Sequence, residues 1–206
     1  MVTESEQASP ADDDGKTAQR GAGLALSKPV VLVGLMGAGK TSIGRRLATR
    51  LNMPFVDADA EIEAAAGRTI EEIFEQHGEA AFRDGERRVI ARLLDGPPQI
   101  IATGGGAYID PATRALIGKR AISLWLRADL DTLVARTARR GNRPLLKHGD
   151  PRETLDRLID RRYPVYAEAD IIVDSCDCPP EETIQAVMAA LTAYLDRDGP
   201  PARRST

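Results

Sequence analysis

The amino-acid sequence predicts an α/β fold of three layers, in which a five-stranded parallel sheet carries helices on both faces. Its strand-length apolar runs are continuous rather than alternating, which is typical of strands buried on both faces. Each run precedes a segment with helical periodicity or helix-start signals, and this strand–helix unit occurs five times. Ligands of such sheets bind beyond the carboxyl ends of the strands, so the residues directly after each run are the first candidates for function.

The five predicted strands cover residues 29–35, 55–56 with the following Asp57-Ala-Asp59, 99–102, 121–126 and 171–173. Helical segments are expected between and after them, at residues 40–51, from the second strand to about 95, from 110, from 129 to about 139, from 150, and from 180 to about 195. Thr69 and Glu72 have capping-box spacing and mark a fresh helix start. Asp110-Pro111 and Asp150-Pro151 each combine an N-cap aspartate with proline at the first helical position.

Composition and charge place the chain among globular proteins of one domain. The net charge of −3 provides no basic field for nucleic acid, and no apolar stretch approaches the roughly 20 residues that span a bilayer. Residues 1–28 are polar and acidic without a signal-peptide pattern, so we expect a disordered tail and a cytoplasmic protein. The domain is then expected over residues 29–196, with a C-terminal tail over 197–206.

Only two cysteines occur, Cys176 and Cys178, with one residue between them. Such a pair is expected to be too cramped for an ordinary structural disulfide and too small a set for a closed zinc site. We therefore expect two free thiols in a reducing compartment. Any metal bound by this chain should take oxygen ligands instead.

The strongest motif is Gly34-Leu-Met-Gly-Ala-Gly-Lys40-Thr41, which matches the phosphate-binding P-loop and lies between a predicted buried strand and a helix. Its glycines let backbone N–H groups curl around phosphate oxygens, and the helix that follows directs its positive end at the same anion. Lys40 can reach the outer phosphates of ATP, and the Thr41 hydroxyl can ligate Mg²⁺. The predicted ATP-binding residues of this segment are Gly37, Ala38, Gly39, Lys40, Thr41 and Ser42.

P-loop domains also serve as GTPase switches and motors. The Asn-Lys-x-Asp motif that selects guanine is absent, because the two asparagines, Asn52 and Asn142, precede Met53 and Arg143. A motor would need a longer chain for its coupling elements. A kinase of small molecules remains, and its acceptor site must be built by the segments that follow the other strands.

Asp57 and Asp59 lie two residues apart at the end of the second predicted strand. In extended geometry this spacing puts both carboxylates on the same side, where one can help hold a metal and the other can accept or orient an acceptor hydroxyl proton. Aspartate is also a favoured helix N-cap, and both interpretations can hold.

Three further features are ambiguous when each is taken alone. Arg83 and Arg162 lie on predicted helices, where a single arginine is more often a solvated surface residue than a ligand. Gly104, Gly105 and Gly106 directly follow the third strand, and such a run indicates either close backbone approach to a ligand or a tight turn.

Taken together, these residues resemble the shikimate kinase family. The signals in order are Gly34 to Thr41, Asp57-x-Asp59, Phe82-Arg83-x-x-Glu86, Gly104 to Gly106, Arg143-Pro-Leu-Leu146 and Arg162-x-Pro-x-Tyr166. The resemblance spans about Val30 to Leu195 and implies a P-loop NTPase fold of the nucleoside monophosphate kinase type. It also implies transfer of the terminal phosphoryl group of ATP to the 3-hydroxyl of shikimate, a step towards chorismate and the aromatic amino acids.

The same resemblance implies roles for individual residues. Residues 57–95 form the substrate-binding region and residues 138–150 the mobile lid. Arg83 and Arg162 look like the clamp for the shikimate carboxylate, with Asp59 as hydroxyl ligand and base, and the glycine run closes the pocket. Lys40 and the lid residue Arg143 look like the catalytic cations, and Mg²⁺ looks to be held by Thr41 and, through water, Asp57.

For the nucleotide base, Arg136 matches the position whose guanidinium stacks on adenine in the family. The facing segment, Asp174 to Pro180, departs from the family pattern where several members carry an arginine. The family leads us to expect a monomer. The main alternative is another P-loop small-molecule kinase such as a gluconate kinase; a P-loop protein with inactive chemistry is disfavoured because Lys40, Asp59 and Arg143 are all present.

Overall fold

The computed structural model describes residues 24, 26–138 and 150–198. Within them a single sheet has the order β2-β3-β1-β4-β5, and all four strand pairings are parallel, as the sequence predicts. The strands are β1 (Val30–Val33), β2 (Phe55–Asp57), β3 (Ile100–Ala102), β4 (Ile122–Arg127) and β5 (Ile171–Asp174). Because β3 lies between β1 and β2, the segments that follow these three strands begin next to one another, at the carboxyl ends of the strands.

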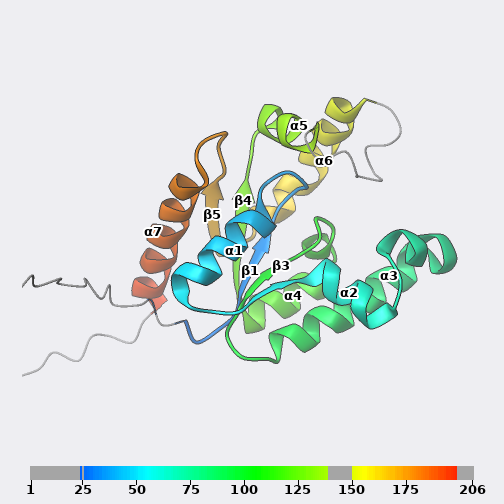
Figure 1. Cartoon of the computed structure of the whole chain (residues 1–206), viewed down its shortest axis with the longest axis horizontal. Helices are drawn as coiled ribbons and strands as arrows, with labels where there is room; N and C mark the ends of the chain where they lie inside the picture. The colour runs from blue at the N-terminus through cyan, green and yellow to red at the C-terminus, as the bar shows by residue number, and fades with distance from the viewer. Residues whose placement is uncertain (1–23, 25, 139–149, 199–206) are drawn as a thin grey trace, which may run out of the picture.

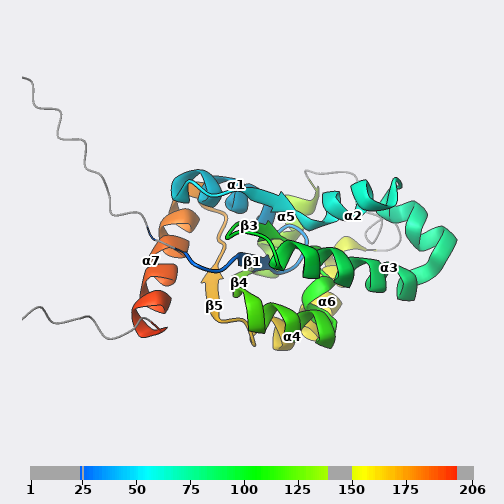
Figure 2. The ribbon, with the colours of Figure 1, turned by 90° about the horizontal axis from the view of Figure 1, so that it is seen from below.

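Helices cover both faces of this sheet, so the three-layer prediction is confirmed. They are α1 (Lys40–Leu51), α2 (Ala58–Ala66), α3 (Ile70–Leu94), the short 3₁₀ helix η1 (Ala107–Ile109), α4 (Pro111–Arg120), α5 (Leu130–Ala138), α6 (Pro151–Tyr166) and α7 (Pro180–Asp198). Helix α1 covers one face and α4 the other (Figure 2). Helix α7 lies beside β5, while α2, which directly follows the carboxyl end of β2, and the first part of α3 project away from the sheet (Figure 1). None of these helices combines the length and apolar character that crossing a bilayer requires.

The central strands explain why the chain folds this way. All four residues of β1 are fully buried, and β3 is buried throughout, since helices remove water from both faces. Apolar side chains from α1, α4 and α7 complete the same core, including Leu47, Ile117 and Val187. The core therefore provides a rigid platform whose strand ends carry the polar residues of interest.

The domain differs from its expected limits at both ends. Leu24 and Leu26 pack against the core although they precede the boundary placed at residue 29, because their apolar side chains lose water contact there. Helix α7 continues to Asp198, two residues beyond the expected end at 196. The remaining residues of the expected tails, 1–23, 25 and 199–206, lie outside the described residues.

The second strand is shorter than the sequence analysis assumed. It ends at Asp57, and Ala58 is already the first residue of α2. The Asp57 side chain caps this helix by accepting the backbone N–H of Asp59 at 3.2 Å. The expectation that both carboxylates extend from a strand is wrong, because N-capping by aspartate stabilises a helix start at this point.

Candidate active site

The loop after β1 is shaped by glycines in left-handed or related backbone conformations. Gly34, Gly37 and Gly39 have φ angles of 136°, 85° and 97°, which residues with a side chain rarely adopt. A Cβ on Gly34 would also lie 2.7 Å from the carbonyl oxygen of Leu126 on β4. The loop then enters α1 at Lys40, so the helix N-terminus faces the turn, as the motif predicts.

Lys40 folds back over this loop. Its Nζ donates to the carbonyl oxygens of Gly34 at 2.7 Å and Leu35 at 2.9 Å. One residue on, the Thr41 hydroxyl donates to Asp57 Oδ2 at 3.1 Å. Thr41 at the start of α1 and Asp57 at the end of β2 are thus hydrogen-bonded to each other. Both side chains offer oxygen atoms, the ligands that Mg²⁺ prefers.

The glycine run after β3 is the meeting point of the predicted acceptor residues. A Cβ on Gly104 would lie 2.6 Å from Asp59 Oδ1, and one on Gly106 would lie 2.6 Å from Arg83 Nη1. A Cβ on Gly105 would lie 3.4 Å from Arg162 Nη1 and 3.5 Å from the carbonyl oxygen of Gly34. A side chain at Gly104 or Gly106 would displace Asp59 or Arg83, whereas the distances at Gly105 are ordinary contacts. The structure therefore favours close approach of these side chains to the backbone over a mere tight turn.

Arg83 is held by a carboxylate that the sequence analysis quoted but gave no role. Its Nη1 donates to Glu86 Oε2 at 2.6 Å, one helical turn along α3, and the Glu86 side chain is only 2% exposed. Burial raises the pKa of the Glu86 carboxyl, the Arg83 guanidinium counteracts this, and the nearby Asp59 adds to the rise. The i, i+3 spacing is the local signal that could have identified this pair, but burial of Glu86 depends on the tertiary fold.

Arg162 and Tyr166, both on α6, bind the Gly104–Gly106 loop through hydrogen bonds. Arg162 Nη1 donates to the carbonyl oxygen of Gly105 at 3.1 Å, and the Tyr166 hydroxyl donates to the same oxygen. Tyr166 is fully buried, and burial raises the pKa of its hydroxyl to about 12. The i, i+4 spacing places both side chains on one helix face. Tyr166 is therefore a second positioning residue that the sequence analysis left without a role.

This burial predicts an alkaline loss of stability that Tyr166→Phe abolishes. An unfolded tyrosine ionises near pH 10, whereas Tyr166 in the folded protein ionises near pH 12, so rising pH favours the unfolded chain through this window. The wild type should lose up to about 2–3 kcal/mol that the variant does not lose. Near neutral pH the variant should be less stable by about 1 kcal/mol, because the hydrogen bond to Gly105 is gone.

Urea unfolding of both proteins between about pH 8 and about pH 11.5 measures the difference directly. Ionisable groups away from residue 166 contribute alike to both proteins, so their contributions cancel in the difference. The wild-type curve should fall towards the variant curve and then cross it as pH rises, because the expected loss exceeds the initial difference of about 1 kcal/mol. Curves that stay parallel would contradict the burial of this hydroxyl.

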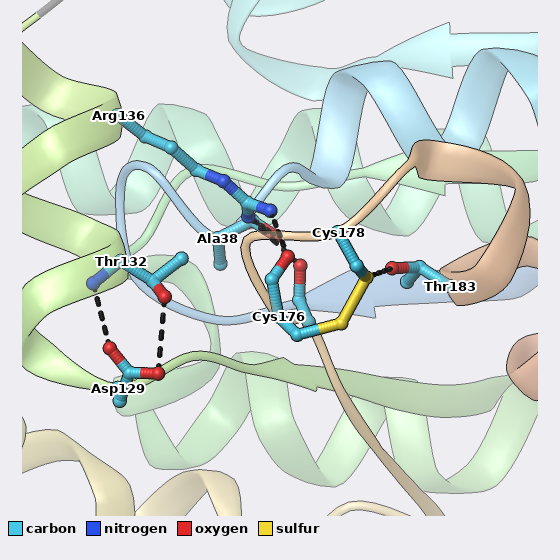
Figure 3. The surroundings of a disulfide bond; sticks show 8 residues. Ala38, Asp129, Thr132, Arg136, Cys176, Cys178 and Thr183 are labelled. Carbon is cyan, nitrogen blue, oxygen red and sulfur yellow. Dashed lines mark hydrogen bonds between the residues drawn. A yellow bond between two sulfur atoms is a disulfide. The ribbon is translucent and has the colours of Figure 1, made fainter.

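Arg136 on α5 lies on the other side of the phosphate loop. Its Nη1 donates to Ser175 Oγ at 2.9 Å and to the carbonyl oxygens of Gly37 and Ala38 at 3.4 and 3.5 Å. Its Nη2 donates to the carbonyl oxygen of Cys176 at 2.5 Å. The residue expected at the adenine side of the site therefore joins three segments: α5, the phosphate loop and the segment after β5 (Figure 3).

The two cysteines are bonded to each other, which corrects the expectation of free thiols. Their Cα atoms are 5.2 Å apart, inside the range that a disulfide needs, although only one residue separates them. The turn after β5 folds the chain back enough to bring the sulfurs together. The Glu182 carboxylate lies within 4.8 Å of both sulfurs, but the disulfide uses both thiols that a metal would need.

Most of the predicted site residues thus come together around two loops. The predicted ATP-binding residues at the loop after β1 are Gly37, Ala38, Gly39, Lys40, Thr41, Ser42 and, from α5, Arg136; the predicted acceptor-binding residues at the loop after β3 are Asp59, Arg83, Gly104, Gly105, Gly106 and Arg162. Asp57 joins the two sides through Thr41. Ser42 lies in the first turn of α1, where its hydroxyl accepts from Arg46 at 2.6 Å. Arg143 and residues 139–149 of the expected lid lie outside the described residues.

This combination of sheet order, glycine-shaped phosphate loop and acceptor side chains beyond neighbouring strand ends defines a P-loop phosphotransferase. Comparison with known proteins narrows the class: the family model described as shikimate kinase matches residues 36–192. The chain belongs to the shikimate kinase family.

Individual relatives agree with this assignment. The shikimate kinase of Paramagnetospirillum magneticum is 61% identical over 83% of this chain and 88% of its own length. That of Caulobacter vibrioides is 56% identical over 80% of this chain and 82% of its own. Among solved structures, shikimate kinase from Acinetobacter baumannii in complex with shikimate has a TM-score of 0.77 at 36% identity, covering 81% of this chain and 94% of that chain. A gluconokinase from Sinorhizobium meliloti shares the fold, with a TM-score of 0.54 at 18% identity over 82% of this chain and 94% of that chain.

Proposed function

We propose that this protein transfers the γ-phosphoryl group of ATP to the 3-hydroxyl of shikimate, giving ADP and shikimate 3-phosphate on the route to chorismate and the aromatic amino acids. One observation carries the proposal: Asp59, Arg83 and Arg162 meet on the Gly104–Gly106 loop, directly beside the phosphate loop. A cyclic acid with one carboxylate and several hydroxyls needs this set of side chains. Its carboxylate matches the guanidinium forks, and one hydroxyl can then face the nucleotide.

On the acceptor side, Asp59 is proposed to bind the reacting hydroxyl and take its proton as the phosphorus–oxygen bond forms. Arg83 and Arg162 bind the carboxylate, and their fixed positions orient the ring. Glu86 and Tyr166 act through these neighbours: Glu86 holds the Arg83 guanidinium, and Tyr166 holds the Gly105 carbonyl. The Gly104–Gly106 backbone closes the pocket without side chains that would displace the substrate.

On the donor side, the phosphate loop with Lys40 is proposed to hold the phosphates of ATP, with Gly37, Ala38, Gly39 and Ser42 supplying the backbone cradle and Arg136 placed beside the base. Thr41 and Asp57 fit Mg²⁺, because their oxygens lie 3.1 Å apart beside the cradle. When bound, Mg²⁺ neutralises charge on the transferring phosphoryl group. Arg143 and the lid over 138–150 are proposed to add a cation and exclude water, a role that rests on the sequence resemblance.

An ADP-release assay with three acceptor conditions tests the reaction. Shikimate should support rapid ADP release, whereas gluconate and buffer alone should not. Release with gluconate rather than shikimate would identify the alternative kinase, and equal release without any acceptor would show an ATPase. The monomeric state and the cytoplasmic location expected from the sequence stay predictions.

Replacing Arg83 with alanine should mainly weaken shikimate binding. Loss of a charge-assisted hydrogen bond corresponds to a rise of about 10- to 100-fold in the KM for shikimate. The KM for ATP should stay near its wild-type value, because Arg83 contacts the Gly106 side of the site. Steady-state kinetics with each substrate varied in turn provide the measurement.

Arg88→Ala is the matched control, since Arg88 lies on the same helix but is exposed and paired with Asp84. It should change neither constant by more than about twofold. If Arg83→Ala moved only the KM for ATP, the carboxylate clamp would be assigned to the wrong residue.

A further inference from the structure

The segment between β5 and α7 is tied to the phosphate loop by one guanidinium. Arg136 donates both to the Cys176 carbonyl and to the carbonyls of Gly37 and Ala38. Ser175, directly before Cys176, is buried and accepts from the same side chain at 2.9 Å. The Arg136 side chain therefore connects the backbone at Cys176 with the loop after β1 (Figure 3).

The disulfide lies in this segment but contributes little to global stability. It closes a loop with a sequence separation of only 2, and a cross-link this short removes little freedom from the unfolded chain. Its effect is local, because it restricts the backbone of the three residues that present the Cys176 carbonyl to Arg136. Cys176 is exposed and Cys178 is half-buried, so a reductant can reach the bond.

We propose that Cys176 and Cys178 form a thiol–disulfide exchange site whose oxidation state sets nucleotide affinity through Arg136. The disulfide holds the Cys176 carbonyl where Arg136 donates to it, so this part of the nucleotide site is already ordered before the nucleotide binds. Reduction frees the three-residue turn, and nucleotide binding must then order it again at an entropic cost. The inference rests on the proposed function only in placing the nucleotide beside Arg136.

A dithiol reductant reduces the Cys176–Cys178 disulfide in two exchange steps. A reductant thiolate attacks Cys176 Sγ, the S–S bond breaks, and Cys178 leaves as a thiolate. The second reductant thiol then displaces Cys176 and closes the oxidised reductant, so that two electrons pass to the protein and each cysteine sulfur takes up a proton.

The surroundings of Cys178 act on it in opposite directions as a leaving group. The Thr183 hydroxyl lies 3.8 Å from its sulfur, and the N-terminal turn of α7 begins two residues later. The Glu182 carboxylate, within 4.8 Å of both sulfurs, disfavours the thiolate. Because the Thr183 hydroxyl and the N-terminal turn of α7 favour a thiolate at Cys178, Cys178 is the leaving sulfur. Cys176 is the attacked sulfur because it is the exposed one of the pair.

ADP binding to the full-length protein tests the proposal without any acceptor present. The protein is prepared oxidised and after treatment with dithiothreitol, and intact mass confirms a difference of two hydrogens. Reduction should raise the Kd for ADP about 5- to 30-fold, the change expected from reordering about one backbone residue. The KM for shikimate should stay within about twofold of its oxidised value.

Two variants make the test specific. The double variant Cys176→Ser/Cys178→Ser should bind ADP like the reduced wild type and should not respond to dithiothreitol. Arg136→Ala should bind ADP more weakly and lose the difference between oxidised and reduced protein, because the connection is removed. Failure to form the disulfide with oxidant, equal ADP Kd in both states, tighter binding after reduction, or a reductant response in the double variant would each overturn the proposal. An inactive enzyme with shikimate would leave these binding results unchanged, so the two failures are distinguishable.

Discussion

Asp59→Asn should lower kcat by about 10²- to 10⁴-fold while leaving the fold intact, the range expected when a positioned base is removed. Asp59 lies in the first turn of α2, and its Oδ1 faces the Gly104 backbone beside the phosphate loop. Asparagine has nearly the same shape and keeps a hydrogen-bond acceptor, but it cannot take the hydroxyl proton. The KM for ATP should therefore change little, and the loss should fall on the chemical step.

Asp84→Asn is the matched control, because Asp84 is an exposed carboxylate that pairs with Arg88 on α3. It should retain near wild-type turnover. Thermal unfolding of both variants checks that stability is not the cause, since removing the Asp59 charge also relieves one contribution that raises the pKa of Glu86. Full-speed turnover by a folded Asp59→Asn protein would exclude Asp59 as the base.

Lys40→Ala should lower kcat by about 10²- to 10³-fold, the range seen when one pre-organised group that stabilises transition-state charge is removed. The ammonium is already held over the phosphate loop by the carbonyls of Gly34 and Leu35. It can therefore pass to the outer phosphates of ATP with little reorganisation. Single-turnover measurements at saturating ATP separate this loss from weakened nucleotide binding.

Lys119→Ala provides the comparison for this variant. Lys119 is exposed in the last turn of α4, away from the contacts of the phosphate loop. Its removal should leave kcat within about twofold of the wild type. A Lys40→Ala protein that lost only ATP affinity, with normal single-turnover rate at saturation, would show that Lys40 binds phosphate but does not stabilise the transition state.

Local patterns in the sequence predicted the elements well because their causes are local. Continuous apolar runs indicated the buried strands β1, β3 and β4, whereas β5 alternates between buried and exposed residues. The glycine spacing of residues 34–39 predicted a tightly turned loop, and the positive φ angles of Gly34, Gly37 and Gly39 agree with it. The capping box at Thr69 and the Asp-Pro starts at 110 and 150 are all present. Each of these signals is decided within a few residues, so no distant contact is needed to interpret it.

The errors arose where a residue could serve two local structures or where the path of the backbone, rather than residue spacing, determined a contact. Asp57 both ends β2 and caps α2, and because its side chain accepts the backbone N–H of Asp59, Asp59 lies in the helix rather than in the strand. The spacing of Cys176 and Cys178 alone argues against a disulfide, whereas the turn after β5 brings the two Cα atoms within disulfide range.

The sequence alone determined the fold class, the phosphate loop and, by resemblance, the family, because these depend on residue order and local backbone preference. Only the tertiary structure decided that Asp59, Arg83 and Arg162 all lie against the Gly104–Gly106 loop. The order β2-β3-β1-β4-β5 places the segment after β3 between those after β2 and β1, and Arg162 reaches Gly105 from 57 residues away. Burial of Glu86 and Tyr166 follows from the same packing, since removal of water depends on neighbours that are remote in the chain.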